Sequence, residues 1–233
     1  PTRALAPATG FVSTAGDIAR FYASLDPAAR RSLLSAASRR RMIRKQWRDE
    51  HGSAGLHYGL GVMIGRVGEW DTVGHGGGFQ SCISRTVMLP GRDLAVAVMT
   101  NAIDGLASAW SEGAIRILQA FADHGPPSAR TRRRDGRWWS LWSTVDLVAF
   151  RDHVKVASPG LTNPFQDAEE IEITGRDVGR IRQAAGFSSH GESVELVRAR
   201  SGKISAVQLA GLRMVPESRY KAELQRRYEG PKP

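Results

Sequence analysis

Three strand-like segments in the middle of the chain constrain the fold more than any other part of the sequence. Residues 70–75 lead into the glycine run 76–78, and residues 80–89 end at a Pro-Gly-Arg-Asp stretch at 90–93. Residues of this kind favour tight connections between antiparallel strands. Residues 94–99 are apolar without alternation, which is typical of a strand buried on both faces. The pattern predicts an antiparallel meander whose last strand lies inside a sheet.

Amphipathic segments on either side of the meander predict helices. Residues 14–25 begin with Thr14 and Asp17, a weak form of the capping box. Residues 27–45 repeat apolar side chains at helical spacing, with arginines on the solvent side. Residues 105–122 predict a third helix. We therefore expect the first half to be of the α+β class, an antiparallel sheet flanked by helices.

The sequence changes character after residue 124 and predicts a second domain. With 233 residues, 41% of them apolar, the chain is long enough for about two domains. Short strand-like runs separated by glycines and polar turns are typical of a small all-β barrel or sandwich. A stretch rich in Pro, Gly and Arg precedes them, as in a linker. The predicted organisation is a first domain at residues 1–124, a basic linker at 125–135, a small β-barrel at 136–217 and a basic polar tail at 218–233.

The net charge of +10 comes largely from arginines, with clusters at residues 39–45 and 130–137. No nucleic-acid-binding motif accompanies either cluster, so we expect no specific nucleic-acid partner; a general attraction to anionic surfaces remains open. No apolar run approaches the roughly 20 residues that span a bilayer. The chain starts at Pro1 without a signal pattern, and we expect it to lack the native N-terminus, so its localisation stays open.

Other residue types that often carry chemistry have simpler interpretations here. The lone Cys82, on an apolar strand, is expected to be a buried thiol. Trp138, Trp139 and Trp142 are expected in the barrel core rather than on a ligand platform. Ser13 is interpreted as a residue at a helix start rather than a nucleophile. The histidines outside the glycine strand lack metal-ligand spacing, so no metal and no cofactor is predicted: His51, His57, His124, His153 and His190.

His75, at the end of a strand and beside Gly76, Gly77 and Gly78, is the strongest candidate for a functional side chain. Acyl transfer needs a nucleophile, a base and donors directed at the oxyanion. An imidazole directed into a cleft could supply a cation or a hydrogen bond, and the glycines would let a substrate lie against bare backbone. The competing interpretation is a histidine satisfied by a neighbouring carbonyl group.

Four motifs, in this order, resemble the C-terminal part of the beta-lactamase-related serine hydrolases, which include class C beta-lactamases, esterases and D-alanyl-D-alanine peptidases. The motifs are A-T-G-F-V-S-T-A-G-D at residues 8–17, Y-G-L-G at 58–61, H-G-G at 75–77 and T-N at 100–101, and the resemblance covers about residues 5–122. It implies a partial beta-lactamase/transpeptidase-like fold. The barrel is similar to the lipocalin-like C-terminal module of some of these hydrolases.

The resemblance also implies a role for each residue of the glycine strand. His75 takes the position of the family's third motif, and the Gly78 N–H group becomes one oxyanion donor. Gly76, Gly77 and Phe79 would contact the substrate, a small-molecule amide or ester. Histidine often replaces lysine here in esterase-like and peptidase-like members, which argues against beta-lactamase activity.

The family's catalytic serine and lysine are missing from their expected place near the N-terminus. The chain's only S-x-x-K is at residues 218–221 and its nearest Y-x-S is at 22–24, and we interpret both as chance matches. One hypothesis is therefore the C-terminal portion of a serine hydrolase, with its nucleophile in a missing N-terminal polypeptide or another chain. The other is a noncatalytic remnant whose barrel binds a small apolar ligand or a partner protein. Self-association is expected if the strand at 94–99 lacks a neighbour.

Overall fold

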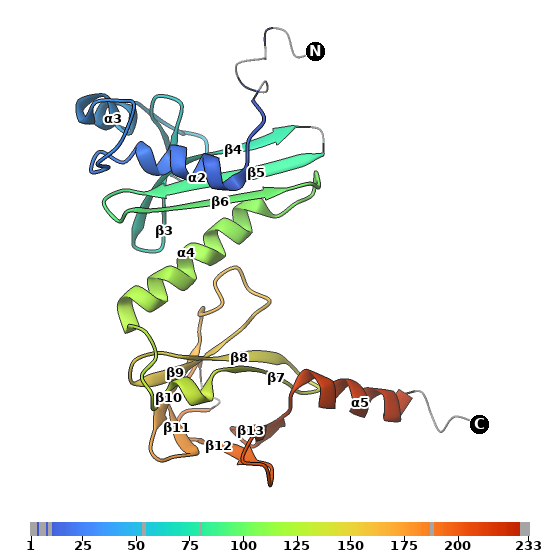
Figure 1. The fold of residues 1–233 in the computed structure, drawn as a ribbon. Helices are drawn as coiled ribbons and strands as arrows, with labels where there is room; N and C mark the ends of the chain where they lie inside the picture. Colours follow the sequence, from blue (N-terminus) through green and yellow to red (C-terminus); the bar gives the residue numbers. More distant parts are fainter. Residues whose placement is uncertain are drawn as a thin grey trace. The chain divides into compact units, whose positions relative to one another are not determined.

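The computed structural model describes residues 4, 8, 11–52, 55–79, 81–186 and 189–228. The chain divides into two compact units, residues 1–116 and residues 117–233 (Figure 1). We call them unit 1 and unit 2 and treat each by itself.

Unit 1 is built on a six-stranded antiparallel sheet in which each strand pairs with the next along the chain. The predicted meander is therefore confirmed. The glycine run lies inside the first of its three long strands rather than in a loop, and that strand pairs with the following one as far as Phe79 and Cys82. The strands are β1 (Trp47–Arg48), β2 (His57–Tyr58), β3 (Met63–Val67), β4 (Trp70–Phe79), β5 (Cys82–Leu89) and β6 (Leu94–Thr100).

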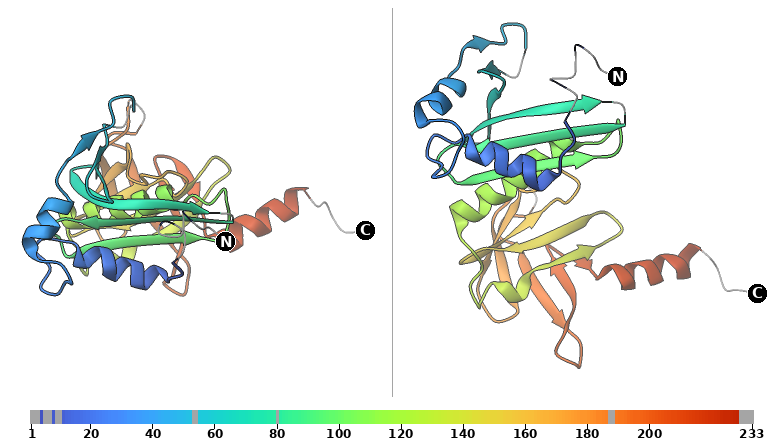
Figure 2. Two further views of the ribbon diagram at one scale, coloured as in Figure 1. Left: turned by 90° about the horizontal axis from the view of Figure 1, so that it is seen from above. Right: turned by 45° about the horizontal axis from the view of Figure 1, so that its top comes forward.

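Helix α2 (Ala15–Ser24) lies along strands β5 and β6 (Figure 2). It begins where the capping pattern predicts, since the Thr14 hydroxyl accepts the N–H of Asp17 at 3.2 Å. The predicted helix at 27–45 is wrong for its first half, because α3 covers only Ala36–Met42. Arg39, expected on the solvent side, is buried, and its guanidinium donates to the carbonyls of Ser24, Pro27 and Ala29. Those bonds hold the preceding segment in turns.

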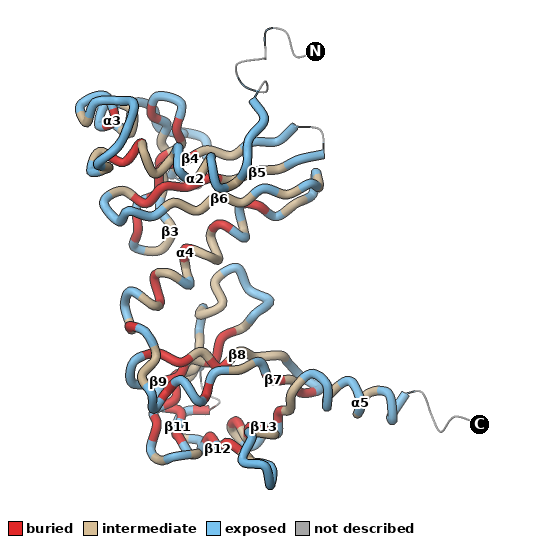
Figure 3. The backbone as a smooth tube through the Cα atoms, viewed as in Figure 1, coloured by how far each residue is buried: buried red, intermediate tan, exposed pale blue. Residues whose placement is uncertain are grey.

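Two expectations about the sheet of unit 1 are wrong. Strand β6 was expected inside the sheet, but it is the edge strand, and none of its residues is buried (Figure 3). Within the described part of the chain no further strand pairs with it. Cys82 is exposed rather than buried, because β4 and β5 form a hairpin that extends past the end of β3, beyond the Met63–Gly74 pair.

Helix α4 (Ala107–His124) follows the sheet and contributes one buried stripe, Ala107, Ser111 and Ile115. On its other side Leu106 and Trp110, next to and in its first turn, are 65% and 67% exposed. Over the described residues, no helix is both long and apolar enough to cross a membrane.

Unit 2 contains the predicted small barrel, an eight-stranded antiparallel sheet. Its two ends meet in a single bridge, because the N–H of Trp139 donates to the carbonyl of Val215 at 2.8 Å and the N–H of Val215 donates back at 2.9 Å. The strands are β7 (Gly136–Trp139), β8 (Thr144–Ala149), β9 (His153–Ala157), β10 (Glu169–Ile173), β11 (Val178–Gln183), β12 (Ser193–Arg198), β13 (Ile204–Leu209) and β14 (Leu212–Met214).

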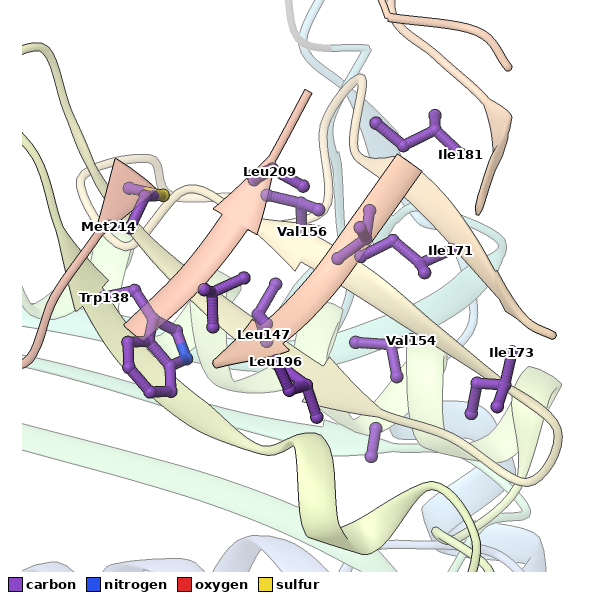
Figure 4. Packing of buried hydrophobic residues seen from close by; sticks show 13 residues of the cluster. Trp138, Leu147, Val154, Val156, Ile171, Ile173, Ile181, Leu196, Leu209 and Met214 are labelled. Atoms are coloured by element: carbon purple, nitrogen blue, oxygen red, sulfur yellow. The ribbon is translucent and has the colours of Figure 1, made fainter. Parts of the chain in front are cut away.

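Thirteen buried apolar residues from all eight strands pack together inside the barrel (Figure 4). Trp138 is one of them, as predicted, whereas Trp142 is 86% exposed at the turn between β7 and β8. Trp139 is half-buried and stacks on Tyr220, with ring centroids 5.6 Å apart. The alternation of inward and outward side chains along each strand explains why neighbouring tryptophans differ.

The ends of unit 2 differ from the linker and tail expected from composition. Residues 125–135 pack on the barrel: Thr131 is fully buried and Arg134, in the short 3-10 helix η2 (Arg132–Arg134), is 5% exposed. The Arg134 guanidinium donates to the carbonyls of Gly175 and Arg176 at 2.6 and 2.9 Å. After the barrel, helix α5 (Glu217–Tyr228) replaces most of the predicted tail. Arginine density misled the prediction because these arginines cap backbone carbonyls.

Candidate functional site

His75 lies in β4, just beyond the last residue of that strand that pairs with β3, and both of its ring nitrogens have partners. Its Nδ1 contacts the carbonyl oxygen of Gly76, and its Nε2 lies 2.9 Å from the hydroxyl of Tyr58. The two aromatic rings meet edge to face, with centroids 5.8 Å apart and an interplanar angle of 87°. Tyr58 belongs to β2, so two strands hold the histidine.

These contacts fix the tautomer of the neutral imidazole. A carbonyl oxygen can only accept, so Nδ1 carries the hydrogen that it donates to Gly76. In neutral His75, Nε2 therefore accepts the O–H of Tyr58; in the protonated form Nε2–H donates to the phenol oxygen instead. The expectation of a histidine satisfied by a carbonyl holds for one nitrogen only. The other faces a group that can both give and take a proton.

Tyr58 is a residue of the site that sequence reasoning missed. It was recognised only as the first letter of Y-G-L-G at 58–61. The turn after it is closed by the N–H of Gly59, which donates to the carbonyl of Val62 at 2.8 Å, so β2 returns as β3 beside β4. One signal in the sequence could have identified it. Tyr58 directly precedes the turn that leads into β3, and the strand after β3 carries His75.

The glycines of β4 differ in how much space a side chain would have at each position. A Cβ at Gly74 would lie 2.0 Å from the backbone oxygen of Thr86, so glycine is required there for the two strands to approach. A Cβ at Gly76 would meet nothing closer than 3.5 Å, an ordinary contact. At Gly77 and Gly78 the nearest atoms are movable side-chain ends, Ser84 Oγ at 2.8 Å and Ile83 Cδ1 at 3.1 Å. The sheet therefore needs Gly74, whereas Gly76 is not needed for packing.

The outer part of the glycine strand is accessible. Gly77, Gly78 and Phe79 are exposed, and 47% of the Phe79 surface is open. Bare backbone beside an exposed aromatic ring can accommodate a small extended ligand, which is the arrangement assigned to these residues from the sequence. Their contact with a substrate stays a prediction.

Burial shapes the ionisation of two groups near Tyr58. Desolvation raises the pKa of the Tyr22 hydroxyl, the neighbouring Tyr58 raises it further, and Arg85 opposes both. Burial lowers the pKa of the Arg85 guanidinium, which also donates to the sulfur of Met63 at 3.5 Å. A half-buried cation therefore lies close enough to the Tyr22 hydroxyl to act on its pKa.

The two chance matches to catalytic motifs have structural contexts of their own. Ser24 lies in α2 and donates to the carbonyl of Phe21. Ser218 lies in α5 of unit 2, and the Lys221 ammonium pairs with Glu217 at 2.7 Å. Among the described contacts of His75, none is to a serine or a lysine.

Unit 1 is thus an antiparallel sheet with helix α2 along it, and His75 and the glycines of β4 lie beyond the part of that strand that pairs with β3. The chain belongs to the beta-lactamase family, whose family model, described as Beta-lactamase, matches residues 1–118. A search of curated protein sequences gives no match.

Three solved structures are similar to this chain. The octameric penicillin-binding protein homologue from Pyrococcus abyssi is 16% identical, with a TM-score of 0.37 and coverage of 80% of this chain and 43% of that one. A structure of SurE is 18% identical, with a TM-score of 0.38 and coverage of 87% and 48%. SurE with D-Leu is 18% identical, with a TM-score of 0.31 and coverage of 78% and 44%. This chain spans less than half the length of each.

Proposed function

We propose that this chain is the C-terminal portion of a serine hydrolase that acts on an amide or ester through an acyl-enzyme. The observation that carries the proposal is His75, fixed at Nδ1 by Gly76 and directed at Tyr58 through Nε2, on an accessible glycine strand within the residues that match the family. The catalytic serine and lysine would come from outside residues 1–233.

In this proposal the strand supports an attacking serine rather than providing one. The Gly78 N–H group donates to the developing oxyanion, and the bare backbone at Gly76 and Gly77 lets the acyl group lie flat. Phe79 contacts the apolar part of the substrate. The Tyr58 hydroxyl donates a hydrogen bond to Nε2 of neutral His75, and this bond keeps the imidazole in one orientation as charge develops nearby. Histidine at this position favours an ester or peptide substrate over a beta-lactam.

The open edge of β6 supports the expected partner. An edge strand exposes unpaired N–H and C=O groups, and apolar side chains of this strand and the segment after it are accessible: Met99, Ile103 and Trp110 are 47%, 64% and 67% exposed. Either a missing N-terminal polypeptide that also carries the nucleophile covers this edge, or the chain associates with itself. The alternative of a barrel that binds an apolar ligand inside it has no such support, because apolar side chains fill the interior.

The test uses the enzyme reconstituted with its N-terminal portion. Gly78→Val keeps the backbone N–H group but places a side chain where the substrate must approach, so it should lower turnover of a chromogenic ester, up to the factor of about 10² to 10³ typical of a lost oxyanion contact. His75→Ala should also lower acylation. Gly160→Val is the matched control, because a Cβ at that position meets only open space. Unchanged turnover in both Gly78→Val and His75→Ala would remove the strand from the active site.

The chain alone should turn over neither a chromogenic ester nor a chromogenic cephalosporin, and light scattering should show that it self-associates. Turnover from a monodisperse monomer that survives both Ser13→Ala and Ser218→Ala would contradict the proposal, since another serine of this chain would then be the nucleophile.

A further inference from the structure

A cationic cavity of about 630 Å³ opens at one rim of the barrel of unit 2. The rim gathers η2, the start of β7, the turn between β10 and β11 and the turn between β12 and β13. A second hollow of about 460 Å³ adjoins it and shares Arg133 and Arg176. The main cavity is lined by Arg133, Asp135, Arg137, Trp138, Arg176, Arg198, Lys203, Ile204 and Pro216.

Positive charge exceeds negative charge in this cavity. Two of its cations are neutralised locally: Arg137 forms two 2.7 Å bonds with Asp146, and Arg198 binds Asp177. The side chains of three others form no hydrogen bond or ion pair with any described residue: Arg133, Arg176 and Lys203. The pKa of the Asp177 carboxyl is lowered by Arg198 first and then by Arg176 and Arg134, as expected where cations are in excess. An anion would relieve the repulsion among the unpaired cations.

The backbone that carries these cations is fixed. Arg134 of η2 donates to the carbonyls of Gly175 and Arg176, and Arg130 donates to the carbonyl of Ile173 at 2.6 Å. These three bonds join the segment before the barrel to the end of β10 and the turn that follows it. The backbones of Arg133 and Arg176 are therefore held on facing sides of the rim before any ligand arrives. Such preorganisation reduces the entropy lost on binding.

One wall of the cavity is apolar. It is made by Trp138, Ile204 and Pro216. Trp138 is 6% exposed, and its indole N–H group has no acceptor among the described residues. A buried donor without a partner is unfavourable and uncommon in folded proteins. The cavity thus combines unpaired cations, a flat apolar surface and a residue with an unused donor.

We propose that this cavity binds a small organic anion, with carboxylate or phosphate groups on an apolar body. The guanidinium fork matches the oxygens of either group, and the cations of Arg133, Arg176 and Lys203 suit more than one negative charge. Trp138 and Pro216 pack against the apolar body. The volume lies in the range typical of small-molecule sites, so a compact ligand fits better than a polymer. The site lies wholly in unit 2 and does not depend on the hydrolase proposal.

The experiment is calorimetric titration of the full chain with four probes: naphthyl phosphate, naphthoate, naphthol and inorganic phosphate. Naphthyl phosphate and naphthoate should bind saturably at one site, the tighter of the two identifying the anionic group. Naphthol, which lacks the charge, and inorganic phosphate, which lacks the apolar body, should bind at least about tenfold more weakly, a difference of about 1.4 kcal/mol.

Two variants that each lose one positive charge distinguish binding in the cavity from a general effect of net charge. Arg176→Ala should weaken binding of the tighter aromatic anion about tenfold. Arg213→Ala removes a cation from β14 of the same barrel that does not line the cavity, and it should leave affinity unchanged. Trp138→Phe removes the indole N–H group together with the five-membered ring; it should weaken binding while the thermal unfolding curve stays cooperative, although at a lower midpoint because Trp138 belongs to the core.

Three results would overturn the proposal. They are the absence of saturable binding by either aromatic anion, an equal loss of affinity in Arg176→Ala and Arg213→Ala, and a single-stranded oligonucleotide that binds more tightly than both aromatic anions and is displaced by neither. The last result would assign the cations to a nucleic acid instead.

Discussion

Unit 2 closes its sheet on itself, whereas unit 1 leaves the last strand of its sheet without a partner. The barrel ends meet through Trp139 and Val215, and its core cluster holds thirteen buried apolar residues. The core cluster around α2 in unit 1 holds five, and β6 remains open. A sheet whose edges are satisfied can bury its apolar side chains from within. A sheet with an open edge leaves backbone N–H and C=O groups unpaired, so we expect the two halves of one polypeptide to differ in how far they can stand alone.

Separating the units should give the largest effect. Residues 117–233 expressed alone should show a cooperative thermal transition by circular dichroism, because the barrel supplies its own core and closes its own edge. Residues 1–116 alone should self-associate in light scattering and melt without a clear transition. If unit 1 proved the more cooperative monomer, the contrast between the two sheets would be wrong.

A shorter fragment tests where unit 2 begins. Residues 136–217, the predicted barrel, omit Thr131 and Arg134, and Asp135, which accepts the N–H of Ala149. We expect this fragment to be clearly less stable than residues 117–233, with a broad melt. If the two fragments were equally stable, residues 125–135 would act only as a linker, as the sequence predicts.

Single substitutions of isoleucine should give the next largest difference in stability between the two units. Ile181→Ala, at a fully buried position of the barrel, should lower the free energy of unfolding by about 2–5 kcal/mol. Ile103→Ala, at a position of unit 1 that is 64% exposed, should change it by less than about 0.5 kcal/mol in the isolated chain. Urea titration of the full chain measures both. A loss at Ile103 as large as that at Ile181 would contradict the contrast between the two units.

Within unit 1, glycine substitutions give an intermediate effect. Gly74→Ala should destabilise the sheet by about 1–3 kcal/mol, because its Cβ would overlap the backbone oxygen of Thr86. Gly76→Ala, two residues along, meets only ordinary contacts and should stay within about 0.5 kcal/mol. Denaturant titration of both variants compares them directly. Equal losses would show that the glycines act through backbone freedom instead of close packing.

The smallest effect concerns pH. Burial, and then Lys155 and His153, lower the pKa of His124, with Glu170 and Asp123 opposing. Below about pH 6.5 the unfolded chain therefore takes up a proton that the folded chain does not, so stability falls as pH falls. His124→Gln should reduce this loss between about pH 7 and pH 5, as measured by thermal melts. His51→Gln, at an exposed position of unit 1, is the control; a matching change there would reject His124 as the source.

Much of the architecture follows from local sequence. The order of strands in unit 1, the start of α2 at Thr14 and the small barrel were all predictable, because turn residues, caps and hydrophobic periodicity act over a few positions. The position of β6 was not, since an apolar run indicates that a strand requires burial but not which chain provides it. The exposure of Cys82 was not predictable either, because the apolar pattern of its strand does not show that the β4–β5 hairpin extends past β3.

Arginine was the residue that sequence reasoning placed least well. Arg39 and Arg134 belong to clusters assigned to solvent, yet each is 5% exposed and donates to several backbone carbonyls. Apart from Arg130, to which Arg134 also donates, their partners lie ten or more residues away, and hydrophobic periodicity does not predict such contacts. The Tyr58 hydroxyl on His75 was missed for the same reason, because it joins residues from strands on either side of β3.

The bridge between Trp139 and Val215 has a consequence for how the protein is made. The first strand of the barrel leaves the ribosome long before its closing partner, so β7 must wait with an open edge while the intervening strands are synthesised. Closure must therefore wait until Val215 has been synthesised. A nascent chain that stops before Val215 does not yield a smaller barrel; it yields a sheet with two open edges, a form prone to aggregation and accessible to proteases.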